Sequence, residues 1–359
     1  MQENKTMATI TQPWRGRYVA PLPDIGPTVR DALAAPSSCV PAGAVLLTLF
    51  NDHHRPLYEL QFRRVRSLAC LVQRLVSVCF GADACRDAIG RAVVGPPVRP
   101  SDFRKGAYVE LTWAKWRLLH SALMHARVVL FIDSDVVLFR NPFAALDAAV
   151  DSHAIRFLAE LACAPTATCG SQPAWRKPSR LPGAAPWPCS LNGGVLLLAS
   201  QTLAARVVER EPIFEYHSIN ASQMPIDQDA ADEIANRRRG EKADFSSCAL
   251  PSSSFVGFCW WAWGYIKGNR TLFDDLRPCE LATFHAHCIV SVAQKRAAME
   301  RMLTKTAHCV GNRSSEGIRE QRLGKWGPAA SPGARARCGR RGVKAEGRKR
   351  EICSTASQV

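Results

Sequence analysis

Two carboxylates, Asp133 and Asp135, stand two residues apart at the end of a short apolar run. The run from Val128 to Ile132 is rich in β-branched residues, which is typical of a buried strand in a parallel sheet. Side chains at i and i+2 of an extended chain point the same way, so two ionised carboxylates there repel each other unless a cation or shared protons neutralise them. At the carboxyl edge of an open α/β sheet, the expected neutraliser is a divalent metal ion. The alternative is a plain strand end, with one carboxylate capping the following helix.

A second set of possible metal ligands lies near the other end of the chain, where a strand is predicted from Leu281 to His287. His285 and His287 are two residues apart, so their side chains are expected to face one way. Neutral imidazole binds first-row transition ions well, and His-x-His at a strand end is a common ligand spacing. A structural histidine is the alternative at either position.

Polar residues also lie at other predicted strand ends, such as Asn51 and Asp52 after the first strand. Asn192, Gly193 and Gly194 open another apolar run, where glycines allow a ligand to approach the backbone and the asparagine supplies a polar side chain.

Acidic and amide side chains open a predicted helix at Asp227 and Gln228. They are candidates for contacts with a ligand. The alternative is that the acids complement the positive end of the helix dipole.

Lys115 lies beside the apolar stripe of a helix predicted from Tyr108 to Ala126. One interpretation is a surface lysine whose stem packs on apolar neighbours. The other is a contact with a ligand, because this helix leads directly into the strand before Asp133.

The elements that must position these side chains alternate between strands and helices. Apolar runs predict strands at 44–50 and 75–80, and helical spacing predicts a helix at 57–71 between them, which makes a βαβ unit with parallel strands. Further strands are predicted near 154–159, 195–199, 243–250 and 281–287, helices at 203–217, 225–238 and 292–304, and loops at 86–107 and 164–188. The alternation predicts an α/β fold.

Charge is unevenly distributed along the 359 residues, which carry a net charge of +16. From Arg313 to Val359 there are 12 Lys and Arg against 4 Asp and Glu, so this stretch supplies +8. We predict three parts: a Pro-rich N-terminal arm (1–40), a folded domain (41–310) and a basic, disordered tail (311–359). The moderately basic body suits phosphorylated or nucleotide ligands, and no nucleic-acid partner is expected because no RNA- or DNA-binding signature is present.

Cysteines and glycosylation sequons indicate an oxidising compartment. The 14 cysteines form no Cys-x-x-Cys pair, which argues against zinc ribbons and thioredoxin-like sites, and Cys163, Cys169 and Cys189 are the best candidates for disulfides. Half of the eight asparagines lie in Asn-x-Ser/Thr sequons, at Asn4, Asn220, Asn269 and Asn312. The N-terminus carries no hydrophobic signal region and no apolar stretch of about 18 residues occurs, so membrane association is expected only through a segment absent from this sequence.

The order of motifs resembles the nucleotide-diphospho-sugar transferase family, close to glycosyltransferase family 77. The matching segments, which span roughly 44–302, are LTLFND, YVELTWAKWRLLHSALMHARVVLFIDSDVVLFRNP, SLNGGVLLL, PIDQDA, ALPSSSF and TFHAHCIVSVAQK. The resemblance implies a GT-A (Rossmann-like) fold for residues 41–310, with a mixed, mainly parallel sheet flanked by helices. It also implies a metal-dependent transferase that moves a sugar from a UDP-type donor to a glycan or glycoprotein acceptor, with retention and an α-linkage. The implied cofactor is Mn²⁺ or Mg²⁺, and the implied location is the Golgi lumen.

The resemblance also assigns roles to individual residues. It implies that Asp133 and Asp135 hold metal and ribose, that His285 is a third metal ligand, and that His287 stands where the family usually has Asn. Ser291 stands where the family usually has Gly, near the diphosphate. The other implied roles are donor binding by Lys115, Lys295, Gly193 and Gly194, and contacts with the transferred sugar or acceptor by Asn192, Asp227 and Gln228.

Three other functions compete with the transferase. Asp133 and Asp135 fit the Asp-x-Asp-x-Val motif of haloacid-dehalogenase-type phosphatases, but the motif follows a complete βαβ unit and no later Gly-Asp-x-x-x-Asp cluster is present. The net charge would suit a basic nucleic-acid-binding protein. The departures at His287 and Ser291 leave a sugar-nucleotide-binding pseudoenzyme open as a third alternative.

Overall fold

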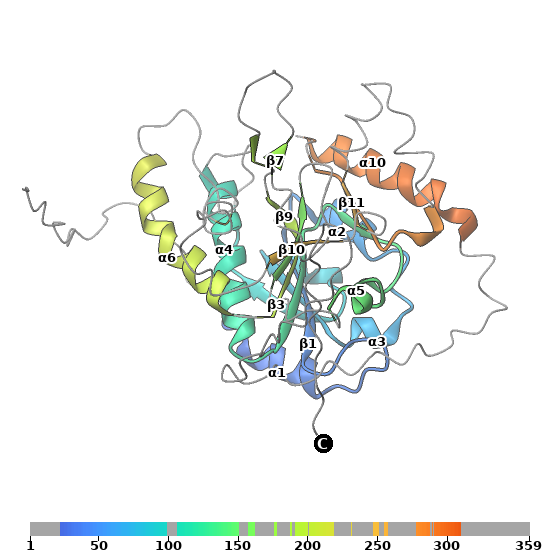
Figure 1. Ribbon diagram of the computed structural model, residues 1–359, viewed down its shortest axis with the longest axis horizontal. Helices are drawn as coiled ribbons and strands as arrows, with labels where there is room; N and C mark the ends of the chain where they lie inside the picture. The colour runs from blue at the N-terminus through green and yellow to red at the C-terminus, as the bar shows by residue number, and fades with distance from the viewer. Residues whose placement is uncertain are drawn as a thin grey trace, which may run out of the picture. The chain divides into compact units, whose positions relative to one another are not determined.

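The computed structural model describes the parts of the chain that build a large central sheet, two smaller sheets and the surrounding helices (Figure 1). The described residues are 22–98, 106–150, 157–161, 176–177, 187–188, 191–199, 201–218, 231, 247–250, 255–257, 278–287, 289 and 291–309. Two compact units divide the chain at residues 324 and 325, and the second lies wholly outside these ranges. The predicted boundaries at 40 and 310 stay a prediction.

A seven-stranded sheet forms the centre of the first unit, in the order β10-β6-β9-β4-β1-β2-β3. The strands are β1 (Ala44–Asn51), β2 (Leu75–Phe80), β3 (Arg91–Gly95), β4 (Val128–Ile132), β6 (Phe157–Leu161), β9 (Leu191–Leu198) and β10 (Ser247–Ala249). Strand β9 runs antiparallel to β4 and β6, and the other four neighbouring pairs are parallel. Every residue of β1, β2 and β4 is buried, as expected for strands covered on both faces. The predicted mixed, mainly parallel α/β sheet is confirmed.

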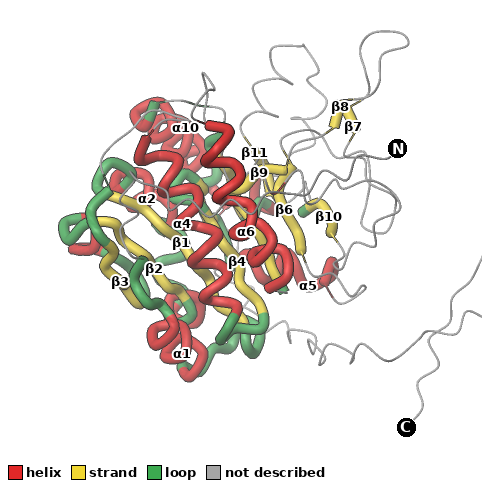
Figure 2. The backbone as a smooth tube through the Cα atoms, turned by 90° about the vertical axis from the view of Figure 1, so that its left-hand side faces the viewer, coloured by secondary structure: helices red, strands yellow, loops and turns green. Residues whose placement is uncertain are grey.

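One face of this sheet is covered by α1 (Gly26–Ala34), α4 (Gly106–Leu123) and α6 (Gln201–Ser218). Helices α4 and α6 pack against each other (Figures 1 and 2). Helix α1 lies within the stretch predicted as an arm, and its Val29 and Ala32 are fully buried in this core. Part of the predicted arm is therefore packed on the domain.

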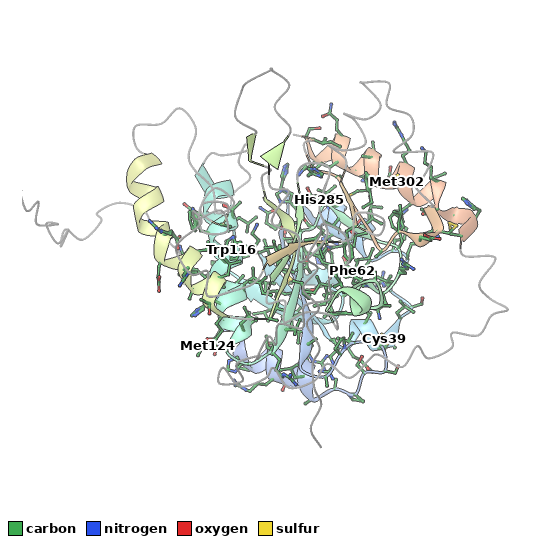
Figure 3. All side chains as sticks on the ribbon, in the orientation of Figure 1. Cys39, Phe62, Trp116, Met124, His285 and Met302 are labelled. Carbon is green, nitrogen blue, oxygen red and sulfur yellow. A yellow bond between two sulfur atoms is a disulfide. The ribbon has the colours of Figure 1, made fainter. Side chains whose placement is uncertain are left out.

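A second apolar cluster joins α2 (Arg55–Gln61) and α10 (Val292–Lys305) to a small sheet. This sheet has the order β11 (Phe255–Gly257), β12 (Thr283–His285) and β5 (Val136–Leu138), with β12 antiparallel to β5. The described part of the chain also contains the short helices α3 (Ala69–Val72) and α5 (Pro142–Val150), and 3-10 helices at Ala84–Asp87, Pro278–Glu280 and Ala307–Cys309. Figure 3 labels one buried member of each cluster, Trp116 and Met302.

Three predicted elements differ from the structure. The helix predicted at 57–71 is broken into α2 and α3 by a turn in which Arg64 donates from Nη2 to the carbonyl of Leu303 at 2.5 Å, a contact with a residue distant in sequence. The loop predicted at 86–107 contains β3, which pairs with β2 only. An edge strand lies against one neighbour and is partly exposed, so its sequence lacks the continuous apolar run of the central strands. Two further short strands, β7 (Arg176–Lys177) and β8 (Trp187–Pro188), pair within the loop predicted at 164–188.

Three disulfides occur among the described residues: Cys39–Cys70, Cys79–Cys85 and Cys279–Cys309. Cys163, Cys169 and Cys189 lie outside the described residues. The last disulfide joins a residue just before β12 to a residue just after α10, and so closes the segment that carries both His285 and Lys295.

No helix in the described part of the chain has the length and apolar character to cross a bilayer.

Candidate functional site

Asp133 and Asp135 lie in the tight turn between β4 and β5. The N–H of Asp133 donates to the carbonyl of Gly194 in β9 at 2.8 Å, and the N–H of Val136 donates back to the carbonyl of Asp133 at 3.1 Å. The N–H of Ala286 donates to the carbonyl of Asp135 at 2.9 Å. The turn that carries both acids is therefore fixed between β9 and the end of β12.

Pairing of β12 with β5 brings His285 to the acidic pair. His285 lies opposite Val136, and its Nε2 is 3.2 Å from Oδ1 of Asp135. Nζ of Lys295, in the first turn of α10, is 2.5 Å from Oδ2 of the same carboxylate. Both oxygens of Asp135 therefore face a nitrogen from the late part of the chain.

The environment of Asp135 keeps its carboxylate ionised. Burial alone would raise the pKa of this group, but the positive charge of Lys295 and the contact with His285 outweigh it, so the pKa of Asp135 lies well below the usual range. Asp135 is therefore a permanent negative charge in an almost fully buried position.

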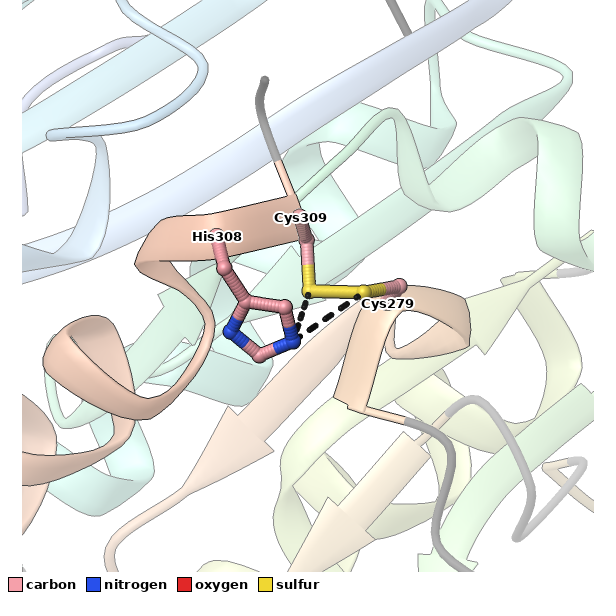
Figure 4. Close-up of side chains that lie close together, drawn as sticks. All are labelled: Cys279, His308 and Cys309. Atoms are coloured by element: carbon pink, nitrogen blue, oxygen red, sulfur yellow. Dashed lines mark hydrogen bonds between the residues drawn. A yellow bond between two sulfur atoms is a disulfide. The ribbon is translucent and has the colours of Figure 1, made fainter. Parts of the chain in front are cut away.

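Asp133, Asp135 and His285 each offer one ligand atom, and these atoms lie within 4.8 Å of one another. Two carboxylate oxygens and an imidazole nitrogen are a donor set that Mn²⁺ accepts readily, and Mg²⁺ accepts the oxygens. The other such group among the described residues is Cys279, His308 and Cys309, in which His308 Nε2 is 3.8 Å from each sulfur (Figure 4). Its two sulfurs are joined in a disulfide, so the first group is the one fit for a divalent cation.

His287 is placed differently from His285. It lies past the end of β12, is buried, and its Nδ1 is 3.2 Å from the carbonyl of His285. The two rings are 4.8 Å apart, and His287 is not part of the group of three ligands. Its predicted role as a metal ligand stays a prediction.

Gly194 makes room for His285. A Cβ built at position 194 would lie 2.6 Å from Nε2 of His285 and closer still to its Cε1. Any side chain at this position would therefore collide with the imidazole that faces Asp135. At Gly194 a histidine of the protein itself lies close to the backbone, and the predicted contacts of Gly193 and Gly194 with the donor stay a prediction.

Lys115 is buried, so its interpretation as a surface lysine is wrong. Its Nζ donates to the carbonyl of Gly193 at 3.2 Å and lies 5.6 Å from the centroid of the Phe131 ring. The lysine therefore supports the backbone of β9 next to the acidic turn. Its predicted role at the donor phosphates stays a prediction.

Three predicted contacts with the transferred sugar or acceptor are not described at the level of side chains. Asn192 lies in β9 opposite Glu160, at an irregularity of the β6–β9 pairing. Asp227 and Gln228 lie outside the described residues.

Residues 94–299, more than half of the chain, match the family model described as nucleotide-diphospho-sugar transferase. The chain belongs to the nucleotide-diphospho-sugar transferase family. The predicted family is confirmed, and the prediction of a glycosyltransferase is confirmed at the level of the family. The phosphatase alternative is wrong: the acidic pair follows β4, after a complete βαβ unit.

Several solved structures are similar to this transferase. The glycosyltransferase GlyE of Streptococcus pneumoniae is 11% identical, with 76% of this chain and 63% of GlyE covered and a TM-score of 0.42, so the chain spans less than two thirds of GlyE. The galactosyltransferase LgtC, solved with donor and acceptor sugar analogs, is 15% identical, with 72% and 95% covered and a TM-score of 0.41. Mouse xyloside xylosyltransferase 1 is 15% identical, with 68% and 98% covered and a TM-score of 0.41. No curated protein matches the transferase.

Gln61 contacts the backbone of the acidic turn and was not identified as a site residue from the sequence. It is fully buried at the end of α2, and its Nε2 donates to the carbonyl of Asp133 at 2.7 Å, while its Oε1 accepts from Oγ1 of Thr48 at 3.3 Å. A buried amide must have its hydrogen bonds satisfied, so this contact fixes the carbonyl of Asp133 in the transferase. The one available signal was a polar residue, Thr48, within the apolar run of β1.

His54 lies close enough to Lys295 and Asp135 for their charges to act on it. Its Nδ1 is 2.7 Å from Oδ1 of Asn51 at the end of β1. Burial, followed by the charge of Lys295, lowers the pKa of His54 to about 4, against the opposing effect of Asp135. His54 is therefore neutral at neutral pH.

We expect His54 to make the transferase less stable as pH falls from 6.5 towards 4. The unfolded chain takes up a proton near pH 6.5, whereas the folded chain does so only near pH 4, so in this window the unfolded state binds more protons and the free energy of unfolding decreases towards acid. This decrease in the free energy of unfolding is absent above the unfolded pKa and reaches about 3 kcal/mol near pH 4. Urea unfolding of wild type and His54→Gln across this window tests it, because the variant should lose that part of the slope. The exposed His125, changed to Gln, is the control, and equal slopes in all three proteins would contradict the assignment.

Proposed function

We propose that the protein is a metal-dependent glycosyltransferase that moves a sugar from a UDP-type donor to a glycan or glycoprotein acceptor, with retention. The family supports the general class of nucleotide-sugar donor. The observation that carries the finer proposal is that His285 and Lys295 lie next to Asp133 and Asp135 at the turn where β4 ends. Such an arrangement of anionic and neutral ligands next to a fixed positive charge suits a metal–diphosphate complex.

In the proposed reaction these side chains act on the diphosphate, which leaves as the bond to the sugar breaks. Asp133, Asp135 and His285 would hold Mn²⁺ or Mg²⁺, which would supply positive charge to that leaving group. Lys295 adds a second positive charge next to the same ligands. Lys115 keeps the carbonyl of Gly193 in place.

Other residues are proposed to contact the transferred sugar and the acceptor. The resemblance to the family supports contacts by Asn192 in β9, and by Asp227 and Gln228. We propose His287 only as an additional ligand, next to His285.

The purified full chain incubated with a panel of UDP-sugars tests this function. We expect release of UDP from at least one donor when Mn²⁺ or Mg²⁺ is present. This release should stop after chelation, because the metal ion is needed to neutralise the diphosphate. p-Nitrophenyl phosphate should not be turned over. Donor binding without turnover in the presence of a glycan acceptor panel would indicate a pseudoenzyme, and no binding of any UDP-sugar would reject the proposal.

We also propose that the protein works in the secretory pathway, in the Golgi lumen. Support comes from four sequons and from three disulfides among the described residues, since disulfides persist in oxidising compartments. A shift in the mass of the cellular protein on treatment with an endoglycosidase is the expected result. An unshifted mass would argue against this location.

A further inference from the structure

Lys295 holds the carboxylate oxygen that a metal ion needs. Its Nζ is 2.5 Å from Oδ2 of Asp135, and Nε2 of His285 is 3.2 Å from Oδ1, so both oxygens of this acid are engaged by nitrogens. The side chain of Asp135 is 9% exposed, which leaves little room for a further cation beside the ammonium group. A divalent ion bound by Asp135 and His285 would therefore have to share its site with a fixed positive charge or replace it.

We propose that Lys295 acts as a built-in counter-cation of the metal site and couples metal binding to nucleotide binding. In the absence of nucleotide, Lys295 neutralises Asp135 and weakens the binding of a divalent ion by charge repulsion and by occupying Oδ2. A nucleoside diphosphate offers the ammonium group another anionic partner, which releases Asp135 to the metal. The inference rests on the proposed function, because it assumes a metal and a nucleoside diphosphate at this site.

The position of Lys295 allows such an exchange. The side chain of Lys295 is 21% exposed, more than twice the value of its partner, and its ammonium group is carried on a long flexible stem. Its backbone is fixed, because the N–H of Lys295 donates to the carbonyl of Ser291 at 3.0 Å. Oγ of Ser291 also caps the helix by accepting from the backbone N–H of Gln294 at 3.1 Å. The head group can therefore change partners while α10 stays in place.

The charges around Asp135 explain why a replacement anion is needed. Nζ of Lys295 lies 2.5 Å from the buried carboxylate of Asp135, so the lysine and the carboxylate depend on each other for charge compensation. Moving the lysine away without supplying a cation would leave a buried, unpaired carboxylate. Metal and nucleotide should therefore bind better together than either alone, by the same factor in both directions.

Mn²⁺ binding followed by electron paramagnetic resonance, with and without UDP, tests the coupling in the full chain. For wild type we expect UDP to tighten Mn²⁺ binding at least tenfold. For Lys295→Met we expect Mn²⁺ alone to bind about tenfold more tightly than in wild type, and the effect of UDP to shrink below threefold. Lys295→Gln should likewise tighten the binding of Mn²⁺ alone and reduce the effect of UDP. It serves as the second variant if Lys295→Met does not fold.

Arg301→Met is the matched control, because it removes a positive charge from an exposed position of the same helix. It should retain wild-type Mn²⁺ affinity and coupling to UDP. If folded Lys295 variants bind Mn²⁺ alone no more tightly than wild type, while wild type releases UDP from a donor, the counter-cation role is rejected and the proposed function stands. If wild type binds no Mn²⁺ even with UDP, both the inference and the proposed metal dependence are rejected.

Discussion

Asp135→Asn is expected to reduce metal-dependent release of UDP from the donor by about 10²–10⁴-fold. The substitution keeps the shape of the side chain but removes the negative charge that both His285 and Lys295 face. A neutral amide oxygen is a much weaker ligand for a divalent cation than a carboxylate, so Mn²⁺ affinity in the presence of UDP should fall by at least about a hundredfold. Initial rates and titrations of Mn²⁺ on the same preparations measure the two effects.

Asp87→Asn is the matched control for this substitution. Asp87 pairs with Arg55, its side chain is 58% exposed, and exposed ion pairs contribute little to stability. Its activity and Mn²⁺ affinity should match wild type. An Asp135→Asn protein that folds and keeps more than about a third of the wild-type rate would show that Asp135 does not hold the metal.

The second large effect is expected from Gly194→Ala, which adds one methyl group next to His285. The new Cβ would lie 2.6 Å from Nε2 of the imidazole, inside van der Waals contact, so either the ring or β9 must move. We expect a fall in activity of about a hundredfold, because misplacing a ligand by about 1 Å is costly, and a loss of about 1–3 kcal/mol of stability from overpacking.

A double-mutant cycle with His285→Ala identifies the cause of that effect. If Gly194 serves to make room for the ring, Gly194→Ala should cost little further stability or Mn²⁺ affinity once the imidazole is removed. Gly26→Ala is the control glycine, because its new Cβ would meet the side chain of the exposed His125, which can move aside. Additive effects of the two substitutions would refute the steric explanation.

The central strands and the acidic turn could be predicted because their signal is local. A continuous apolar run marks a strand buried on both faces, and it placed β1, β2 and β4 with nearly their observed bounds. The same reasoning placed Asp133 and Asp135 at the end of β4. The edge strand β3 was missed because a partly exposed strand lacks a continuous apolar run. The break between α2 and α3 was missed because it depends on a contact with the end of α10, which is distant in sequence.

The roles of the two histidines depended on where β12 ends. Extended geometry predicts that His285 and His287 face one way, but the strand stops at His285, and the turn after it brings Nδ1 of His287 to the carbonyl of His285. One histidine therefore faces Asp135, and the other lies outside the group of three ligands. Residue spacing alone does not report the last residue of a short strand.

From the sequence alone one could determine the α/β class, the strand that ends in Asp133 and Asp135, and the chemical types able to hold a metal and a diphosphate, because each follows from residue type and local periodicity. Only the tertiary structure decided that Lys295 and His285 share the two oxygens of Asp135, that Gly194 clears space for the imidazole, and that Gln61 holds the carbonyl of Asp133. These contacts join residues from 72 to 160 positions apart. They arise from the order in which strands pair and helices pack, which no local pattern encodes.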